Sequence, residues 1–221
     1  MLTQFLKLYL LCLALFYLSS CTDTNAVTDV DGNVYKTVKI GNQIWMAENL
    51  KVTKYSNGNP IFQVADNSDW SNQNTGAFCN YNNFLKNVKA YGRLYNWYAV
   101  TDSRNLAPEG WHLPSSDEIV ELVNSLKGDT IAAAKMKMDS GIWLNSGAST
   151  TNESGFSALP SGYRYHDGTF HTFGSNGYWW TTTKSYEIYD WSPRLFDSFA
   201  DVIRDPEYMN YGFAVRCVKD E

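Results

Sequence analysis

The clearest alternation of apolar and polar positions lies between residues 148 and 183. This stretch is rich in Gly, Ser and Thr, yet it carries eight aromatic side chains. Such a composition favours short strands joined by tight turns over a helix. Asp167-Gly168 is a two-residue turn signal between two aromatic-rich runs. We therefore predict a hairpin that pairs Tyr165 with Phe170 and Arg164 with His171.

The predicted register assigns the side chains of this hairpin to two faces, because neighbouring residues of a strand point to opposite sides. The face expected to meet the core carries Tyr163, Tyr165, Phe170 and Thr172. The opposite face carries Arg164, His166, Thr169 and His171. The next predicted strand, residues 178–183, places Trp179 and Trp180 on opposite faces. One of these tryptophans must then be covered by a second layer or exposed.

Two further regions alternate in the manner of strands. Turn signals at Asp31-Gly32 and Gly41-Asn42 divide residues 30–46 into hairpins, and the second turn pairs Val38 with Trp45. Residues 212–218, GFAVRCV, form the last predicted strand. There Arg216 alternates with apolar neighbours, so we expect its guanidinium to be partly buried and paired with a carboxylate or with carbonyls.

A helical period appears after Pro114. Ser115 and Glu118 have the spacing of a capping box at a helix start, and Gly128 marks the end. The apolar stripe between them consists of Ile119, Leu122, Val123 and Leu126. Residues 130–138 predict a second short helix, and residues 93–100 favour a helix over a strand.

Residues 55–83 are rich in Asn, Asp, Ser and Gly and are predicted to be mostly loop. Loops of this length inside a domain usually bind something or are pinned by a contact. The side chains of this segment that offer oxygen ligands for Ca²⁺ are Asp66, Asp69, Asn72, Asn80, Asn82 and Asn83. Turn formation explains the same residue types, and their spacing matches no calcium loop. We therefore expect no cofactor, with Ca²⁺ as the open alternative.

The first twenty residues have the layout of a secretory signal. Lys7 precedes an apolar run, residues 8–18, that is too short to span a bilayer. Leu-Ser-Ser-Cys follows and resembles a bacterial lipobox, so we expect Cys21 to carry acyl chains that bind the protein to a membrane. The alternative is an ordinary cleaved signal with a cysteine nearby. The predicted organisation is a signal peptide at 1–20, a tether at 21–29 and one domain at 30–221.

Charge and cysteine content narrow the partners. Without Lys7 the predicted mature chain has a net charge of −6 and no basic run, which argues against nucleic acid or an anionic membrane surface as partner. Cys79 and Cys217 remain after the signal and Cys21 are set aside. An even pair in an exported protein predicts a disulfide, while metal binding is the weaker alternative because neither residue belongs to a C-x-x-C motif.

Catalytic signals are weak in this chain. It contains no G-x-S-x-G, H-E-x-x-H, P-loop or dinucleotide motif. His166 and His171 share a predicted hairpin face, but Arg164 would repel a bound cation, and exposure on a solvated strand explains both. His112, just before the helix cap, is expected to be packed or bonded to the backbone. We therefore expect a protein that is not an enzyme.

Five ordered segments resemble the Fibrobacter succinogenes major paralogous domain family of exported bacterial lipoproteins. They are VYKTVKIGNQIWMAENLK, FCNYNN with YGRLYNWYAV, APEGWHLPSSDE, TNESGFSALPSGYR with GYWWTTT, and YGFAVRCVKD. Together they span about residues 34–220. The order of HLPSSDE and the late GF-x-VRC is also remotely similar to C-type-lectin-like domains and formylglycine-generating enzymes. The latter would need two active cysteines near the C-terminus, where only Cys217 stands, so we discount oxidase chemistry.

The resemblance implies an α+β, C-type-lectin-like fold, with short antiparallel sheets, two flanking helices and long loops that carry the ligand site. It implies a non-catalytic binding or adhesion module of the cell envelope, lipid-anchored in the outer membrane, with a glycan or a surface protein as partner. In such folds the ligand face maps to Asn152, Glu153, Trp179 and Trp180. The alternatives are an enzyme acting on envelope polysaccharide or protein, and a structural subunit of a surface assembly.

Overall fold

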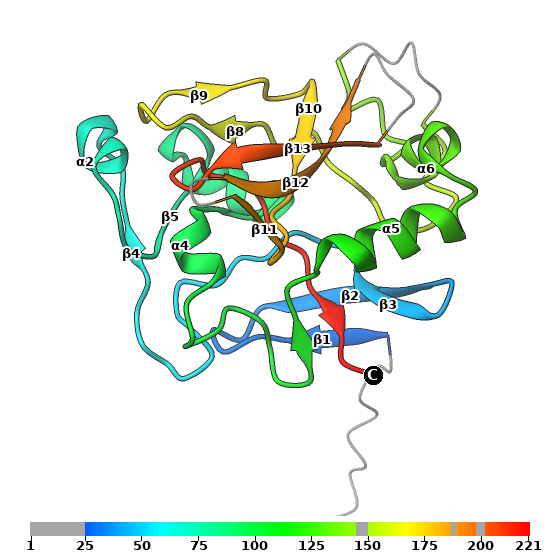
Figure 1. The fold of residues 1–221 in the computed structure, drawn as a ribbon, viewed down its shortest axis with the longest axis horizontal. Coiled ribbons are helices and arrows are strands. Elements are labelled where there is room, and N and C mark those ends of the chain that lie inside the picture. Colours follow the sequence, from blue (N-terminus) through cyan, green and yellow to red (C-terminus); the bar gives the residue numbers. More distant parts are fainter. Residues whose placement is uncertain (1–24, 145–149, 187–188, 198–201) are drawn as a thin grey trace, which may run out of the picture.

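The computed structural model describes residues 25–144, 150–186, 189–197 and 202–221. The predicted signal peptide and Cys21 lie outside these residues. The fold is α+β, as predicted, with mostly antiparallel sheets and a few short helices (Figure 1). A five-stranded sheet occupies the lower part of Figure 1, a four-stranded sheet the upper part, and helices α5 and α6 lie along one side.

The lower sheet joins the two ends of the described chain. In spatial order it contains β1 (Ala26–Thr28), β2 (Val34–Ile40), β3 (Gln43–Met46), β14 (Val218–Lys219) and β7 (Trp111–His112), all paired antiparallel. The Gly41-Asn42 turn is confirmed, because Val38 lies opposite Trp45. Strand β1 begins at Ala26, so the sheet already includes residues that we predicted to belong to the tether.

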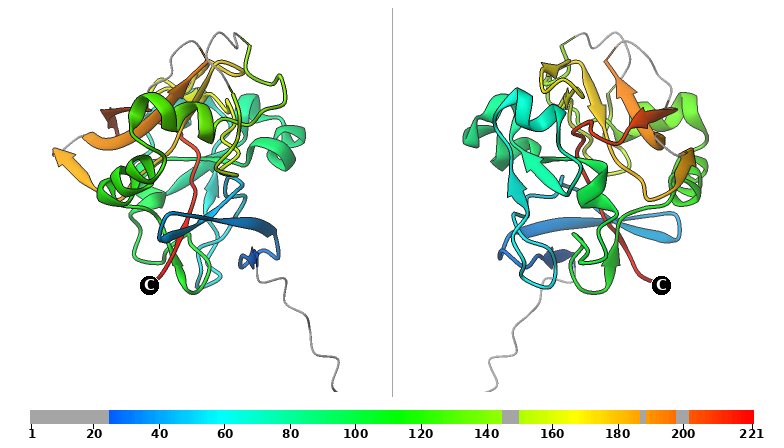
Figure 2. Two further views of the ribbon diagram at one scale, coloured as in Figure 1. Left: turned by 90° about the vertical axis from the view of Figure 1, so that its right-hand side faces the viewer. Right: turned by 60° about the vertical axis from the view of Figure 1, so that its left-hand side comes forward.

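The upper part of the molecule contains three smaller sheets. In the four-stranded sheet, β12 (Tyr189–Phe196) pairs with β10 (Asn176–Tyr178), β11 (Lys184–Tyr186) and β13 (Val202–Tyr208). A second sheet contains β4 (Phe62–Gln63), β5 (Ala77–Cys79) and β6 (Leu94–Tyr95), and the third is the hairpin of β8 (Tyr163–Arg164) and β9 (Phe170–His171). The hairpin lies at the end of the molecule opposite β1, as both views in Figure 2 show.

The helices are short, and the strongest sequence signal among them is confirmed. The bounds are α2 (Asn67–Ser71), η1 (Tyr81–Asn83), η2 (Leu85–Asn87), α3 (Val88–Tyr91), α4 (Trp97–Val100), α5 (Ser116–Ser125) and α6 (Asp129–Met136). At the start of α5 the Glu118 N–H donates to Ser115 Oγ (3.3 Å), and the Ser115 N–H donates to Glu118 Oε2 (2.7 Å). The predicted apolar stripe of α5 is buried.

The segment 93–100, which we predicted as a helix, divides into strand β6 and the single turn α4. Asn96 stands between them in an extended conformation. Its side-chain oxygen accepts hydrogen bonds from the N–H groups of Ala77 (2.9 Å) and Ala99 (3.0 Å). One amide thus holds the end of a strand and caps the following helix, which is why periodicity alone did not separate the two elements.

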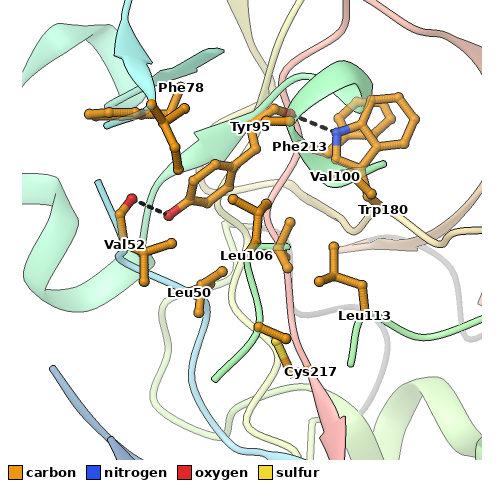
Figure 3. Packing of buried hydrophobic residues seen from close by; sticks show 14 of the residues in the cluster. Leu50, Val52, Phe78, Tyr95, Val100, Leu106, Leu113, Trp180, Phe213 and Cys217 are labelled. Atoms are coloured by element: carbon orange, nitrogen blue, oxygen red, sulfur yellow. Dashed lines mark hydrogen bonds between the residues drawn. The ribbon is translucent and has the colours of Figure 1, made fainter. Parts of the chain in front are cut away.

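Two hydrophobic cores meet at the segment directly after β10, which contains Trp179 and Trp180. Trp180 belongs to the first core, where its Nε1–H donates to the Tyr95 carbonyl (2.6 Å) beside Phe213 (Figure 3). Trp179 belongs to the second core, between α5 and the lower sheet, together with Trp45. The predicted opposite orientation of the two tryptophans is therefore correct, and a layer of side chains covers each of them.

The predicted register of the β8–β9 hairpin is wrong by one residue. Tyr163 pairs with His171 and Arg164 with Phe170. The connection is longer than a two-residue turn: Tyr165 N–H donates to the Thr169 carbonyl (2.7 Å), and Gly168 takes a left-handed φ of 91°. A shift of one residue changes which residues of the two strands share a face. Arg164 now shares a face with Phe170 and is fully buried.

The predicted disulfide between Cys79 and Cys217 is not formed. Both thiols are free and buried. Cys79 contributes to a third, smaller core with Trp70, whereas Cys217 lies in the first core. Each sulfur is surrounded by its own apolar neighbours, and burial raises the pKa of Cys79 to about 12 and also raises that of Cys217. Both residues act as small apolar core side chains.

Candidate functional site

The four residues predicted to bind a ligand have structural roles. Asn152 has a φ of 48°, and its side chain is bonded to Ser157 through Oδ1 (2.8 Å, from the Ser157 N–H) and Nδ2 (3.0 Å, to Ser157 Oγ). Glu153 is exposed and forms an ion pair with Lys135 (3.0 Å). Trp179 and Trp180 are 4% and 0% exposed. These residues do not form an open stacking surface.

Arg216, by contrast, is buried and paired as predicted. Its Nε–H donates to Asn49 Oδ1 (2.8 Å), and its terminal nitrogens donate to the carbonyls of Phe156 and of Ser157 (2.9 Å to Ser157). Asn49 Oδ1 also accepts from Trp179 Nε1 (2.9 Å). Burial lowers the pKa of Arg216 to about 9. The guanidinium therefore ties the last strand to the loop that contains Phe156.

No metal site has formed among the residues that the structure describes, where no three His, Cys, Asp or Glu side chains converge. Of the residues considered for Ca²⁺, Asp66 caps helix α2 by accepting from the Asp69 N–H (3.0 Å). Asn82 and Asn83 take left-handed φ angles of 50° and 58°. These roles are those expected of turn residues, and the binding of Ca²⁺ stays a prediction.

The surface with the strongest binding character is an aromatic ledge at the β8–β9 hairpin. We define the ledge by six side chains: Tyr163, Tyr165, His166, His171, Tyr208 and Tyr211. Ring centroids of neighbouring members lie between 4.1 and 6.3 Å apart. His166 and Tyr211 are nearly parallel, at 14°. Tyr208 is 41% exposed and His171 is also exposed, whereas Tyr163, Tyr165 and His166 are half-buried and Tyr211 is only 7% exposed. The ledge is therefore open to solvent at Tyr208 and His171 and closed at Tyr211.

The ledge is continuous with the first core, which holds it in place. Tyr211 contacts Phe213 at 5.7 Å between ring centroids, and Tyr163 contacts Tyr178 at 4.7 Å. The rings reach the surface at the hairpin and at Tyr208, the last residue of β13. An aromatic surface supported from below loses little conformational entropy when it binds a ligand.

The buried Arg164 fixes the hairpin from beneath. Its guanidinium donates to the carbonyls of Gly168 (2.8 Å), Val64 (2.6 Å), Ala65 (2.9 Å) and Asp66 (3.0 Å). It also lies over the ring of Trp70, 4.5 Å from the centroid. This arginine joins the hairpin to the loop before α2. It is buried in the observed register, whereas the predicted register, which differs by one residue, placed it on the face away from the core.

A short hydrogen-bonded chain forms the polar edge of the ledge. Thr169 Oγ1 lies 2.6 Å from Asp167 Oδ1 and 2.7 Å from His171 Nε2. Hydrogen bonds from the side chain and backbone of Thr169 lower the pKa of Asp167. Asn210 adds an amide that donates to the His166 carbonyl (3.4 Å). Rings and polar groups thus stand side by side on one surface.

His112 has a role that the sequence did not reveal. Its Nε2 lies 2.6 Å from Glu118 Oε1, and its Nδ1 lies 2.6 Å from Asp220 Oδ1. Burial disfavours the imidazolium, but the hydrogen bonds to Asp220 and Glu118 outweigh this effect and raise the pKa of His112 above 6.5. Both ring nitrogens are occupied, so His112 acts as a clamp between the start of α5 and the C-terminal end of the chain, not as a free base.

This clamp predicts a pH-dependent stability. Because the folded pKa of His112 is raised, its contribution is fully present below the unfolded pKa of about 6.5 and is lost as the pH rises through the folded value. The difference in free energy of unfolding between wild type and His112→Gln should therefore be larger at pH 5.5 than at pH 8.5. We expect a change below about 1 kcal/mol, because the side chain is 41% exposed. Urea unfolding at a series of pH values measures it.

The control for this experiment is Asp220→Asn, which removes one carboxylate and leaves the capping box intact. It should shrink the pH dependence without abolishing it. A difference between wild type and His112→Gln that stays constant from pH 5.5 to 8.5 would rule out the clamp.

A cleft of about 550 Å³ opens beside β7, at the other end of the molecule from the ledge. Its walls include Trp111, Glu109, Asp220 and Asp29. Trp111 is only 8% exposed. The carboxylate of Asp29 accepts from the backbone N–H groups of Asp31 and Asn33 (2.9 Å each) and from Tyr35 Oη. The cleft therefore offers neither an open ring nor a free buried carboxylate, and the ledge is the better candidate.

The comparison with protein families decides the membership of the chain. The model of the Fibrobacter succinogenes major domain matches residues 38–219. The chain belongs to this family. The family domain therefore includes the hairpin, the ledge, Arg216 and most of the lower sheet, and leaves strand β1 outside. Comparison with curated proteins and with solved structures gives no match. No helix among the described residues is long and apolar enough to cross a membrane.

Proposed function

We propose that the protein is a non-catalytic binding or adhesion module of the cell envelope, anchored in the outer membrane by lipid at Cys21, and that the aromatic ledge is its contact surface for a glycan. The observation that carries this proposal is the ledge itself. Partly exposed aromatic rings stand beside hydrogen-bonding groups on a rigid support. Rings pack against the apolar faces of sugars, and polar neighbours bind their hydroxyl groups.

The position of the ledge supports a role that faces away from the anchor. Only three residues, 22–24, separate Cys21 from Asn25, the first described residue. The four steps from Cys21 to Asn25 allow a reach of roughly 14 Å in extended chain. Strand β1 and the β8–β9 hairpin lie at opposite ends of the molecule in every view (Figures 1 and 2). A short anchor at the β1 end therefore leaves the ledge directed away from the membrane.

A C-type-lectin-like arrangement forms part of the same proposal. The strands nearest the two ends of the described chain share one sheet, and α5 and α6 lie beside each other at one side of the molecule. The segments between them carry the hairpin and the ledge. These features support the proposed arrangement, but function rests on the ledge and not on the fold.

A structural subunit of a surface assembly is the second candidate. Phe84 and Leu85 are adjacent in the chain and are 53% and 70% exposed. Neighbouring exposed apolar side chains of this kind favour contact with another protein. His112 does not support the alternative of an enzyme acting on envelope polymers, since both of its ring nitrogens are hydrogen-bonded to carboxylates.

Glycan binding is tested with the full chain in detergent against a panel of soluble oligosaccharides and insoluble polysaccharides. Wild type should bind at least one of them, and Tyr208→Ala and His166→Ala should each weaken that binding by roughly fivefold, as about 1 kcal/mol per lost ring contact implies. Phe62→Ala is the matched control, because Phe62 is an aromatic residue that is 69% exposed outside the ledge. Binding that survives both ledge substitutions, or is lost equally in the control, would remove the ledge from the proposal.

A further inference from the structure

We infer that the ledge selects glycans that present hydroxyl or ammonium groups and rejects polyanionic glycans such as polyuronates. This inference rests on the proposed function, because it assigns the class of ligand to the same surface. It follows from the direction of the hydrogen bonds along the chain Asp167, Thr169, His171, where the two groups left for a ligand are acceptors.

The positions of the protons can be assigned from the chain Asp167, Thr169, His171. The carboxylate of Asp167 carries no proton at neutral pH, since hydrogen bonds from Thr169 lower its pKa. Its Oδ1 accepts from the Thr169 N–H (2.8 Å) and lies 2.6 Å from Thr169 Oγ1. Two acceptors at this separation would repel each other, so the Thr169 hydroxyl must donate its proton to Asp167.

This assignment also fixes the tautomer of His171. Because the only proton of Thr169 Oγ1 is directed to Asp167, the contact of 2.7 Å with His171 requires Nε2 to be the donor. In the neutral ring Nδ1 then has no proton and is an acceptor. The edge therefore offers Asp167 Oδ2 and His171 Nδ1, both on exposed residues, and both need a donor from the ligand.

The positive charge of Arg164 does not offset the negative charge of Asp167 at the polar edge. Arg164 is fully buried, and its guanidinium is engaged by the carbonyls beneath the hairpin. The exposed charge of the edge is the carboxylate of Asp167, on a chain with a net charge of −5. A neutral sugar supplies hydroxyl donors to the two acceptors, whereas a uronate brings a second carboxylate next to Asp167. Like charges at an interface reject the wrong partner.

The test compares ligands that differ at C6, where the uronate carries a carboxylate in place of the hydroxymethyl group of the neutral sugar. The full chain in detergent is titrated with β-1,4-linked mannose and glucose hexamers and with the corresponding hexauronates, at low salt and at about 0.5 M salt, where the Debye length is only about 4 Å. At least one neutral hexamer should bind at least tenfold more tightly than its uronate, and the gap should narrow at high salt. Asp167→Asn should narrow the gap at low salt, whereas Glu109→Gln, an exposed acid of the cleft beside β7, should leave it unchanged.

The outcomes separate the inference from the proposed function. If a hexauronate binds as tightly as its neutral counterpart, or more tightly, the selection by charge is wrong while glycan binding stands. If Asp167→Asn leaves a tenfold gap intact, the selection does not arise from the polar edge and the inference is also wrong. Binding to none of the four hexamers rejects the inference, and absence of binding to the broader panel rejects the function itself.

Discussion

Replacing Arg216 with leucine is expected to lower the free energy of unfolding by about 3–5 kcal/mol. Leucine cannot donate hydrogen bonds, so the carbonyls of Phe156 and Ser157 would lose their buried donors, and Asn49 Oδ1 would keep only Trp179. The guanidinium also lies 4.3 Å from the centroid of the Phe156 ring. The loss therefore combines unpaired polar groups with a weakened contact between the last strand and this loop.

Urea unfolding at neutral pH measures the effect, and Arg104→Leu is the matched control. Arg104 is paired with Asp102 at the surface, with a side chain that is 39% exposed. Its replacement should lower the free energy of unfolding far less than Arg216→Leu does, because the pair is screened by solvent. Equal effects of the two substitutions would mean that the buried hydrogen bonds of Arg216 contribute nothing beyond those of a surface arginine.

Replacing Cys21 with serine is expected to leave the protein soluble or unprocessed, with less of it in the membrane fraction than of the wild type. The acyl chains proposed at this position would supply about 0.8 kcal/mol for each CH₂ group buried in the bilayer. The described helices contain no span that would replace them. Fractionation of cells followed by immunoblotting measures the distribution, and mass spectrometry of the wild-type N-terminal peptide detects the lipid.

Cys12→Ser provides the control, because Cys12 lies in the apolar run of the predicted signal and is not expected to be modified. This variant should remain in the membrane fraction. Membrane association of Cys21→Ser at the wild-type level would overturn the lipid anchor, while the ledge and its ligand could still be tested independently.

Features encoded by neighbouring residues were predictable. The capping box of Ser115 and Glu118 and the turn at Gly41-Asn42 depend on a few adjacent positions, and both appear as predicted. Burial of Arg216 followed from its alternation with apolar residues in one strand. In each case the physical signal lies within one element, so a single sequence contains enough information.

The hairpin register could not be derived in the same way. Asp167-Gly168 is a valid turn signal, but the same two residues fit a two-residue loop and a longer loop equally well. Gly168 permits the φ angle that either loop requires. The choice depends on Arg164, which in the observed register reaches the carbonyls of residues 64–66, about a hundred positions away in the chain. No local pattern reports such a contact.

The aromatic ledge needed the same long-range information. Its rings come from the hairpin, from Tyr208 at the end of β13 in another sheet, and from Tyr211, which follows that strand. The sequence shows an aromatic-rich region, but it predicted the ligand site at Trp179 and Trp180. Adjacent residues of a strand point to opposite faces, so alternation alone predicts that only one of the two faces a given core. The second core beneath α5 covers Trp179, and only the packing of that helix reveals it.

By itself, the sequence determined membership of the family, the α+β class, the capped helix α5 and the burial of Arg216, because these depend on ordered motifs and on local periodicity. The tertiary structure decided which side chains reach the surface. It kept Cys79 and Cys217 apart as free thiols in separate cores, enclosed both tryptophans, and gathered the ledge rings at one end of the molecule. Exposure is set by the layers that cover an element, and those layers come from distant parts of the chain.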